Sequence, residues 1–321
     1  MTRLAYQIPN FTYPGTAPDQ IFGNVVAQAK AAEAAGFDRV LLMDHFYQLP
    51  GIGAHTEPMF ECYTMLAALA QHTNTVRLSA LVTGNTYRNP TLLAKSVTAL
   101  DHVSGGRATL GIGAGWFELE HNSLGYEFGT FTDRFEKLEE ALQIIVAMLN
   151  GETVSLQGKH YQVTDAVNSP APISRVPVMI GGGGEKKTLR MVAQYADESN
   201  LGGCPDEEIP RKLDALAGHC ERLGRDRSQI KVTKMVMCHV APTTEQADAD
   251  LRATAAAKGW SDEIVEMAKG MLVYGDPDTV GERLEATMAT GIDGLTINMA
   301  GNGHIPERIE LLGQVAGKVL G

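Results

Sequence analysis

The sequence predicts an α/β fold, a (β/α)8 barrel with insertions. Strand-like and helix-like runs alternate from end to end and give about eight strand–helix pairs. Most of the strand-like runs are continuously apolar, as expected for strands buried on both faces of a parallel sheet. A length of 321 residues with 44% hydrophobic residues is enough for one large core. A doubly wound open sheet would fit the same observations and stays open at this point.

The first half of the chain alternates regularly. An alanine-rich helix ends at Gly36, a common helix stop. A later helix begins at Pro90, whose ring suits the first turn, and the last helix of this half carries its leucines on one face. The expected strands are 4–8, 39–43, 76–82 and 107–112, and the expected helices are 19–35, 58–72, 90–103 and 132–149.

The second half continues the alternation but contains two additional segments. Residues 152–174 include a hairpin pattern around Gly158, and residues 243–273 add two helical stretches. Neither could bury a core of its own, so we expect insertions within one domain, 1–321. The expected strands are 178–180, 198–201, 230–240 and 294–299, and the expected helices are 185–195, 207–223, 244–258, 262–269, 277–290 and 306–320.

Charge and composition exclude several classes of protein. With a net charge of −11 and a pI near 5.3, the chain is not expected to bind nucleic acid or a membrane surface. The N-terminus reads as a strand without a signal peptide, and no apolar run is long enough to span a membrane. The four cysteines, like the acidic and histidine residues, lack metal-site spacing. We therefore predict no metal and a reducing, cytoplasmic location.

The segment 176–190 predicts a phosphate site. A short apolar strand leads into Gly181, Gly182, Gly183 and Gly184, and a helix with lysines in its first turn follows. Glycines let the backbone approach a ligand, and the free amides of a helix N-terminus favour an anion. The segment matches neither a Walker A loop nor a dinucleotide fingerprint. The alternative is a glycine-rich turn without a ligand.

Polar residues follow the predicted strands at the end where barrels bind ligands. Asp44 and His45 follow the second strand. A histidine titrates near neutral pH, so His45 at the barrel mouth would suit proton exchange with a redox cofactor; the alternative is a pair that only braces a loop. No Gly-x-Ser-x-Gly nucleophile motif is present. Other strand-end candidates are Thr83, Asn200, His239 and Asn298, and the aromatic residues Tyr6, Tyr47, Tyr63 and Trp116 would form either an aromatic wall or packed core.

Several of these motifs, in this order, form a known pattern. They are AAEAAGFDRVLLMDH at 31–45, TYRNP at 86–90, LDHVSGGR at 100–107, LGIGAGW at 110–116, VMIGGGGEKK at 178–187 and GDPDTVG at 275–281. Together they resemble the luciferase-like flavin and deazaflavin oxidoreductases, a TIM-barrel family, and most closely its actinobacterial members that use coenzyme F420. The resemblance covers essentially the whole chain.

The resemblance implies positions for the cofactor and the chemistry. His45 is the implied catalytic residue, and the pair Asp44 and His45 would border the reactive ring of F420. A non-prolyl cis peptide is implied at Ala80–Leu81, where it would support the ring. The amides of the glycine loop would hold the cofactor phosphate. The implied cofactor-binding residues are Asp44, His45, Ala80, Leu81, Thr83, Gly111, Gly113, Trp116, Gly181, Gly182, Gly183, Gly184 and Glu185.

Two departures from the sugar-phosphate dehydrogenases of this family concern the substrate. Those enzymes have a tryptophan soon after the Asp-His pair, where this chain has Tyr47 and Leu49. They also have an acidic residue just after the strand-four glycines, where this chain has Trp116. A sugar phosphate is therefore not the expected substrate. We expect specificity to lie in the loop 48–56 and in the insertion 243–273.

The expected function is hydride transfer between F420 and a small organic substrate. Two alternatives stay open: an FMN-dependent luciferase-like monooxygenase, and a flavin-binding barrel without catalysis. We expect no macromolecular partner other than a second copy of the chain, in a homodimer.

Overall fold

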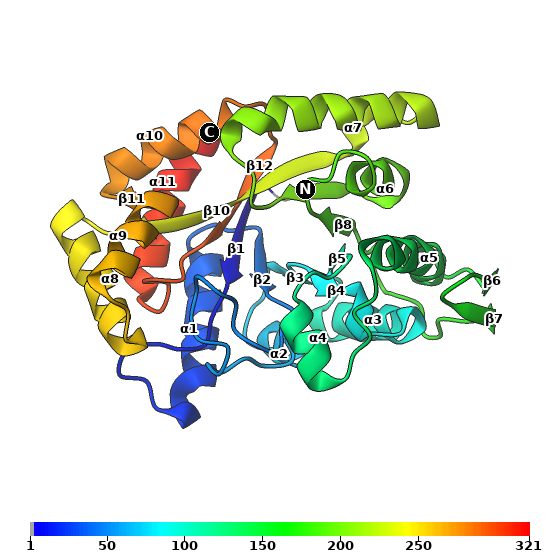
Figure 1. Ribbon diagram of the computed structural model, residues 1–321, viewed down its shortest axis with the longest axis horizontal. Coiled ribbons are helices and arrows are strands. Elements are labelled where there is room, and N and C mark those ends of the chain that lie inside the picture. The colour runs from blue at the N-terminus through cyan, green and yellow to red at the C-terminus, as the bar shows by residue number, and fades with distance from the viewer. Residues whose placement is uncertain (1–2) are drawn as a thin grey trace.

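The centre of the molecule is a barrel of parallel strands surrounded by helices (Figure 1). The computed structural model describes residues 3–321, so the first two residues of the predicted domain 1–321 lie outside the described residues. In spatial order, the barrel strands are β3 (Arg77–Ala80), β2 (Arg39–Leu42), β1 (Leu4–Ile8), β12 (Gly294–Asn298), β10 (Lys231–Val240), β9 (Glu198–Leu201), β8 (Val178–Gly181), β5 (Leu110–Gly113) and β4 (Thr83–Gly84).

The two ends of this order meet because β3 and β4 are successive parts of one interrupted strand. β3 pairs with β2, and β4 pairs with β5. A parallel bridge between Leu78 and Ala108 also joins the β3 edge to the segment before β5. With β3 and β4 counted as one strand position, the predicted (β/α)8 barrel is confirmed and the open sheet is excluded.

Helices surround the strands of the barrel (Figure 1). None of the helices within residues 3–321 is long and apolar enough to cross a membrane. The α-helices are α1 (Ile21–Ala34), α2 (Cys62–Ala70), α3 (Pro90–Ser104), α4 (Glu118–Leu124), α5 (Phe131–Leu149), α6 (Thr188–Tyr195), α7 (Ile209–Leu223), α8 (Thr244–Lys258), α9 (Asp262–Met271), α10 (Pro277–Met288) and α11 (Pro306–Leu320). The short 3-10 helices are η1 (Pro18–Gln20), η2 (Asn85–Tyr87), η3 (Asp206–Glu208) and η4 (Arg227–Gln229).

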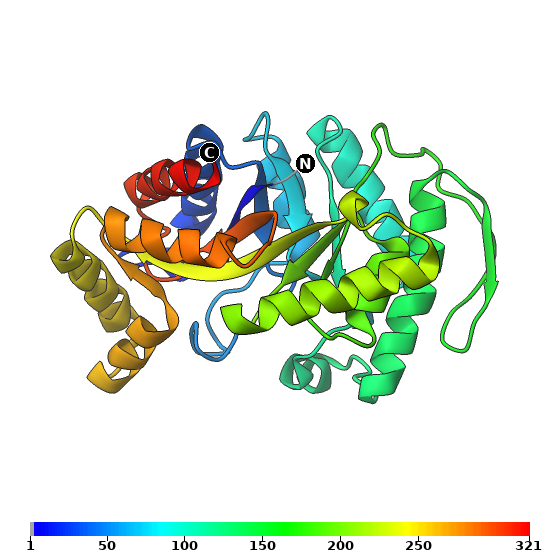
Figure 2. The same cartoon turned by 90° about the horizontal axis from the view of Figure 1, so that it is seen from above.

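The two additional segments lie at opposite ends of the molecule (Figures 1 and 2). In one of them, β6 (Val154–Gln157) and β7 (Gln162–Ala166) form the predicted antiparallel hairpin. Its turn is held by Glu140 of α5, which accepts hydrogen bonds from the amides of residues 159–161 at 2.8–2.9 Å. In the other, α8 and α9 lead to β11 (Val273–Gly275), which pairs with the far end of β10 and was not expected from the sequence.

Alternating strand residues divide the core into an inner and an outer part. In β2, Val40 and Leu42 pack with the helices, whereas Leu41 packs inside the barrel with Ala5 and Met179. The small inner cluster of Ala5, Leu41, Leu81 and Met179 fills the barrel below its upper end, which is the end where the strands finish. The lower end is the end where the strands begin. At the lower end, Arg39 and Glu198 form a buried ion pair with an N–O distance of 2.8 Å.

The same alternation decides how the interrupted strand is built. Ala80 faces the helices and Leu81 faces the barrel interior. The amide of Leu81 still donates to Leu42 O at 2.8 Å, so regular pairing with β2 continues through Leu81. The non-prolyl cis peptide follows at Leu81–Val82. The prediction of a cis bond at Ala80–Leu81 is therefore wrong by one residue, because the strand stays regular one residue longer than expected.

Three aspartates fix neighbouring strands at the lower end of the barrel. Asp38, Asp197 and Asp293 each directly precede a strand. Their carboxylates accept from the amides of Leu4, Val178 and Val232, each at 2.9 Å. Their own amides donate to the carbonyl oxygens of those same three residues at 2.7–2.8 Å. Each aspartate thus sets the register between its own strand and the neighbouring one.

Candidate active site

A cavity of about 730 Å³ opens at the carboxyl ends of the barrel strands. This is the end of the barrel where a (β/α)8 fold places its ligands. Its walls are mainly apolar, with a few polar side chains between them. The predicted site residues in its walls are Asp44, His45, Leu81, Thr83, Gly113, Trp116, Gly181 and Gly182.

Asp44 is a buried structural support in this site. Its carboxylate binds Arg88 at 2.6 Å and accepts from the amide of Gly84 at 3.1 Å. Burial raises the pKa of Asp44 above its ordinary value, although Arg88 and the Gly84 amide oppose the rise. Arg88 also binds Glu61, which caps α2 through the amides of residues 63 and 64. Asp44 therefore ties the end of β2 to β4 and to α2, and it forms no hydrogen bond with His45.

His45 is paired with Glu120. Its Nδ1 lies 2.7 Å from Glu120 Oε1, and Glu120 also accepts from the amides of Phe46 and Tyr47 at 2.8 and 3.2 Å and from the Tyr87 hydroxyl. Burial would raise the pKa of Glu120, but the hydrogen bonds from His45, Tyr87 and Phe46 outweigh it, and the pKa lies below the ordinary value. Glu120 is thus a carboxylate near neutral pH, although its side chain is fully buried.

An ionised carboxylate can only accept hydrogen bonds, so the proton between the two groups sits on His45 Nδ1. The other ring nitrogen, Nε2, has no hydrogen-bond partner among residues 3–321. Because His45 lines the cavity, this nitrogen is available to a bound molecule. Glu120 thus acts on His45 as a buried acid acts on other catalytic histidines, by fixing one tautomer of the ring.

Sequence reasoning did not find Glu120. It lies on α4, a seven-residue helix that was not expected. The acidic residue that the sequence lacks at position 116 is supplied four residues later, by the first turn of this helix. Trp116 itself lies beside His45. The two rings meet edge to face, with their centroids 5.7 Å apart. The signal available in the sequence was an acidic residue shortly after the strand-four glycines, but only the fold shows that it reaches His45.

The glycine loop follows β8 as predicted, but α6 begins at Thr188 rather than at 185. Gly182 has φ +116°, a conformation that suits glycine. Gly183 O accepts from Lys212 Nζ at 3.0 Å. The amides of Gly183 and Gly184 donate no hydrogen bond to any residue of the described chain. These two amides, with the ammonium group of Lys212 nearby, are able to receive an anion.

Five of the predicted cofactor residues lie outside the cavity wall. Ala80 faces the helices, and a Cβ on Gly111 would collide with Ala80 O and Met179 inside the barrel. Gly183 and Gly184 lie just beyond the wall, in the loop itself. Glu185 forms an ion pair with Arg211 at 3.1 Å.

The remaining polar and aromatic candidates separate into two sets. Thr83, Asn200 and Asn298 line the cavity, and Thr83 is held by the Tyr63 hydroxyl at 2.7 Å. Asn298 is buried and donates to Gln7, but its Oδ1 has no hydrogen-bond partner among the described residues. His239 is stacked on Tyr274, away from the cavity. Of the four aromatic candidates, Trp116 lines the cavity, whereas Tyr6, Tyr47 and Tyr63 do not.

The two segments expected to control specificity meet at the cavity. Leu49 to Ile52 and Met271 line it. Lys258, at the end of α8, is almost fully buried and binds Ile52 O at 2.9 Å and the Glu57 carboxylate at 2.7 Å. We call this contact the Lys258 clamp; it fastens the loop after β2 to the α8–α9 insertion.

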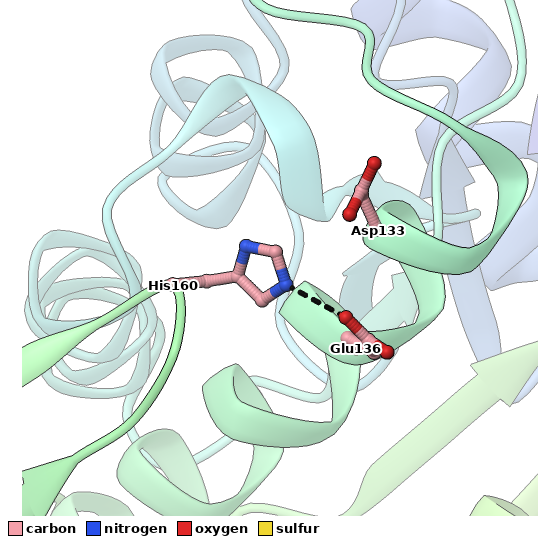
Figure 3. A group of neighbouring side chains, drawn as sticks. All are labelled: Asp133, Glu136 and His160. Carbon is pink, nitrogen blue, oxygen red and sulfur yellow. Dashed lines mark hydrogen bonds and ion pairs between the residues drawn. The ribbon is translucent and has the colours of Figure 1, made fainter.

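One further group of side chains has the composition of a metal site (Figure 3). Asp133 and Glu136 lie on α5, and His160 lies in the turn between β6 and β7, with its Nε2 3.1 Å from Glu136. Lys159 Nζ lies 3.4 Å from Asp133 and 2.8 Å from Glu136. The ammonium group thus already supplies the positive charge that these carboxylates need. None of these residues lines the cavity, and the absence of a metal centre stays a prediction.

The chain is similar in sequence and in fold to known proteins. The family model of luciferase-like monooxygenases matches residues 2–294. A relative named F420-dependent glucose-6-phosphate dehydrogenase, from Microbacterium testaceum, is 29% identical over 84% of this chain and 85% of its own. Among solved structures, an F420-dependent secondary alcohol dehydrogenase with an F420–acetone adduct has a TM-score of 0.78 at 18% identity, covering 99% of both chains. A type II Baeyer–Villiger monooxygenase from Pseudomonas putida, in complex with FMN, has a TM-score of 0.73 at 19% identity, also over 99% of both chains.

Proposed function

The chain belongs to the luciferase-like monooxygenase family, and on that basis we propose that it is an F420-dependent oxidoreductase. It transfers a hydride between the deazaflavin coenzyme F420 and a small organic substrate. The observation that carries this proposal is the buried Glu120–His45 pair, which presents one free imidazole nitrogen in a cavity beside a glycine loop. The relative named F420-dependent glucose-6-phosphate dehydrogenase supports the choice of coenzyme.

The residues present fit such a coenzyme. The cavity of about 730 Å³ has the size of a cofactor site. Gly183 and Gly184 supply free amides and Lys212 a cation for a phosphate group, as proposed from the sequence. The unpartnered Oδ1 of Asn298 calls for a donor from a bound polar molecule. When bound, the coenzyme supplies a two-electron acceptor or donor for hydride transfer.

The chain's own contribution to the reaction is a proton site. His45 holds its Nδ1 proton against Glu120, so Nε2 takes a proton from a substrate hydroxyl during oxidation. In the reverse direction, the protonated ring returns that proton to a developing alkoxide. The negative charge of Glu120 stabilises the imidazolium that forms in either direction. Trp116 and the apolar walls exclude water from the proton transfer.

The test of the proposal is a fluorescence titration of the flavin-free protein with F420 and, separately, with FMN. We expect F420 to bind with a micromolar or lower Kd and FMN to bind much more weakly. The alternative, an FMN-dependent monooxygenase, is supported by the fold shared with the FMN-bound neighbour. Protein that is purified with stoichiometric FMN and consumes oxygen would refute the F420 assignment.

We further propose that residues 1–321 act as one unit, in a homodimer, in the cytoplasm. The four cysteines are free, and three of them are buried, which suits a reducing compartment. Light scattering after gel filtration should give twice the chain mass of 34.5 kDa. A mass of one chain at micromolar concentration would exclude the dimer.

A further inference from the structure

We propose that the substrate of this site is an uncharged, mainly hydrocarbon secondary alcohol, or the corresponding ketone, and not a sugar phosphate. The inference rests on the proposed function and adds a substrate class to it.

The walls of the cavity are apolar at the two specificity segments and along β10. Leu49 and Ile52 come from the loop after β2, and Met235, Met237 and Met271 from β10 and the end of α9. Methionine and aliphatic side chains adapt to hydrocarbon surfaces and offer almost no hydrogen bonds. Trp116 and Met271 line the cavity and are nevertheless more than half exposed, so they leave apolar surface for a ligand to cover.

The charged groups in the cavity wall already have partners within the protein. The carboxylate of Asp44 is paired with Arg88. Apart from His45, the one cationic side chain in the described cavity wall is Arg134. Its guanidinium binds Gly115 O and Gly129 O at 3.1 and 3.0 Å and lies over the Phe128 ring.

Neither of the two nearby lysines is available to a substrate. Lys258 is buried in its clamp with Glu57 and is not part of the cavity wall. Lys212 binds Gly183 O and lies 3.2 Å from Glu208, on the side that we assign to the coenzyme phosphate. A substrate phosphate would therefore lose its hydration, and the one cation in the wall, Arg134, is already held by two carbonyl oxygens and a ring, so its binding is unfavourable.

The polar group that is left free for the substrate, His45 Nε2, matches a single hydroxyl or carbonyl oxygen of that substrate. In oxidation, the substrate O–H proton goes to His45 Nε2, the C–H bond breaks, and its hydride with two electrons goes to oxidised F420. The carbon–oxygen double bond of the ketone forms as these two bonds break. Reduction of the ketone by reduced F420 is the same step in reverse, so atoms and electrons balance in both directions.

The test uses a pair that binds without reacting. A ketone and oxidised F420 are both in the oxidised state, so calorimetry on F420-saturated protein measures binding alone. We expect affinity to rise about fourfold with each added methylene from acetone to 2-heptanone, because each buried CH₂ contributes about 0.8 kcal/mol. An affinity independent of chain length, or tighter binding of glucose 6-phosphate than of 2-heptanone, would overturn the proposal.

A pair of variants locates the effect. Met271→Glu should weaken 2-heptanone binding at least tenfold by placing a charge in the wall. Met267→Glu, one turn earlier on α9 and outside the wall, should leave it unchanged; the two methionines are 52% and 56% exposed, so both variants should fold. Equal effects of the two variants would contradict the assigned wall.

The outcome stays separate from that of the proposed function. The F420 titration is performed first, and failure to bind F420 would refute the proposed coenzyme only. The ketone series on FMN-loaded or flavin-free protein would still decide between an apolar and a phosphorylated ligand, because the walls belong to the protein.

Discussion

At the scale of single residues, the site depends on a buried acid that contacts no ligand. Glu120 accepts four hydrogen bonds, and one of them fixes the proton of His45 on Nδ1. Glu120 is therefore a positioning residue. Its role is to set which nitrogen of His45 carries the proton, rather than to contribute to the affinity for a ligand.

Replacing the carboxylate by an amide tests that role. In Glu120→Gln, the amide group is able to donate to Nδ1, which leaves the proton on Nε2, the wrong nitrogen for taking a proton. We expect kcat to fall about 100-fold, a typical size for lost acid–base assistance, and the acid limb of the kcat–pH profile to move. The Kd for F420 should change by less than about threefold.

The matched control is Glu118→Gln, an exposed glutamate on the same helix. It should behave as the wild type in both kcat and its pH profile. If Glu120→Gln lowers only the melting temperature and leaves the pH profile unchanged, Glu120 is a structural residue alone.

His45 is the residue on which the proposed chemistry depends. We expect His45→Ala to lower turnover about 10²–10⁴-fold, the range of general acid–base catalysis, and to change F420 affinity much less. The reason is that the proposed phosphate contacts come from the glycine loop after β8, whereas His45 follows β2. Steady-state F420 reduction and equilibrium titration would measure the two effects. Unchanged turnover in a folded, coenzyme-saturated variant would remove His45 from the mechanism.

His239 should make the protein sensitive to acid. It is fully buried, and burial lowers its pKa from about 6.5 to about 4 although Ala247 O accepts from its Nε2. The folded state therefore resists protonation. The free energy of unfolding is unaffected above about pH 6.5 and falls by on the order of 3 kcal/mol as the pH drops to about 4.

Urea unfolding at pH 7.5 and pH 4.5 would measure this loss. In His239→Phe, which keeps a ring against Tyr274, the difference between the two pH values should shrink. The exposed His55→Phe is the control and should keep the wild-type difference. Equal acid sensitivity in all three proteins would show that other groups dominate.

At the scale of elements, the glycine loop and the helix that follows it define the proposed phosphate site. A Cβ on Gly183 would lie 3.3 Å from the Lys212 side chain, and a Cβ on Gly184 would lie 3.0 Å from Thr188 Oγ1. Gly184→Val should therefore reduce F420 affinity at least tenfold, with little change in the melting temperature.

The control for this variant is Gly23→Ala on α1, where a Cβ would meet nothing within 4 Å. It should bind F420 normally and be slightly more stable, as expected for alanine in a helix. Normal F420 binding by Gly184→Val would mean that the loop is only a turn.

Elements determined by local patterns were predicted well, and elements determined by distant contacts were not. The range 306–320 of α11 and the strand 198–201 were predicted to the residue; for α11 the local signal is Pro306 in the first turn. α2 begins at Cys62 rather than at 58 because the Glu61 carboxylate caps it. β11 exists through its pairing with β10, which no local pattern indicates.

The site was predictable in the same uneven way. His45 and the glycine loop follow apolar strands, and strand ends converge in a barrel. The role of Glu120 depends on a short helix that folds back over the end of β2. The positions of Ala80 and Gly111 depend on which face of a strand is inward. Apart from Arg77, every residue of β3 and β5 is small or apolar, so the sequence carries no alternation that would distinguish the two faces.

At the scale of the whole molecule, function and stability occupy opposite ends of the barrel. The upper end carries the cavity, and the lower end carries the three aspartates that fix strand register. Asp197→Asn should destabilise the protein by about 1–3 kcal/mol, the usual effect of weakening a partly buried hydrogen bond to a charged group. Turnover at 25 °C should stay within about twofold of the wild type.

Urea unfolding and steady-state kinetics on the same preparation would test this separation. Asp262→Asn is a suitable control, because Asp262 is almost fully exposed. A loss of turnover in Asp197→Asn without a loss of stability would show that the two ends of the barrel communicate.

The Lys258 clamp has a consequence for how new specificities arise in this scaffold. The loop after β2 and the α8–α9 insertion lie about two hundred residues apart in the sequence. The ion pair between Lys258 and Glu57 nevertheless couples them, so a change in one segment requires a matching change in the other. A recombinant that takes only one of these segments from a differently clamped relative leaves a buried lysine or glutamate without its counter-charge. Laboratory shuffling of such genes should therefore yield folded chimeras mainly when both segments come from the same parent.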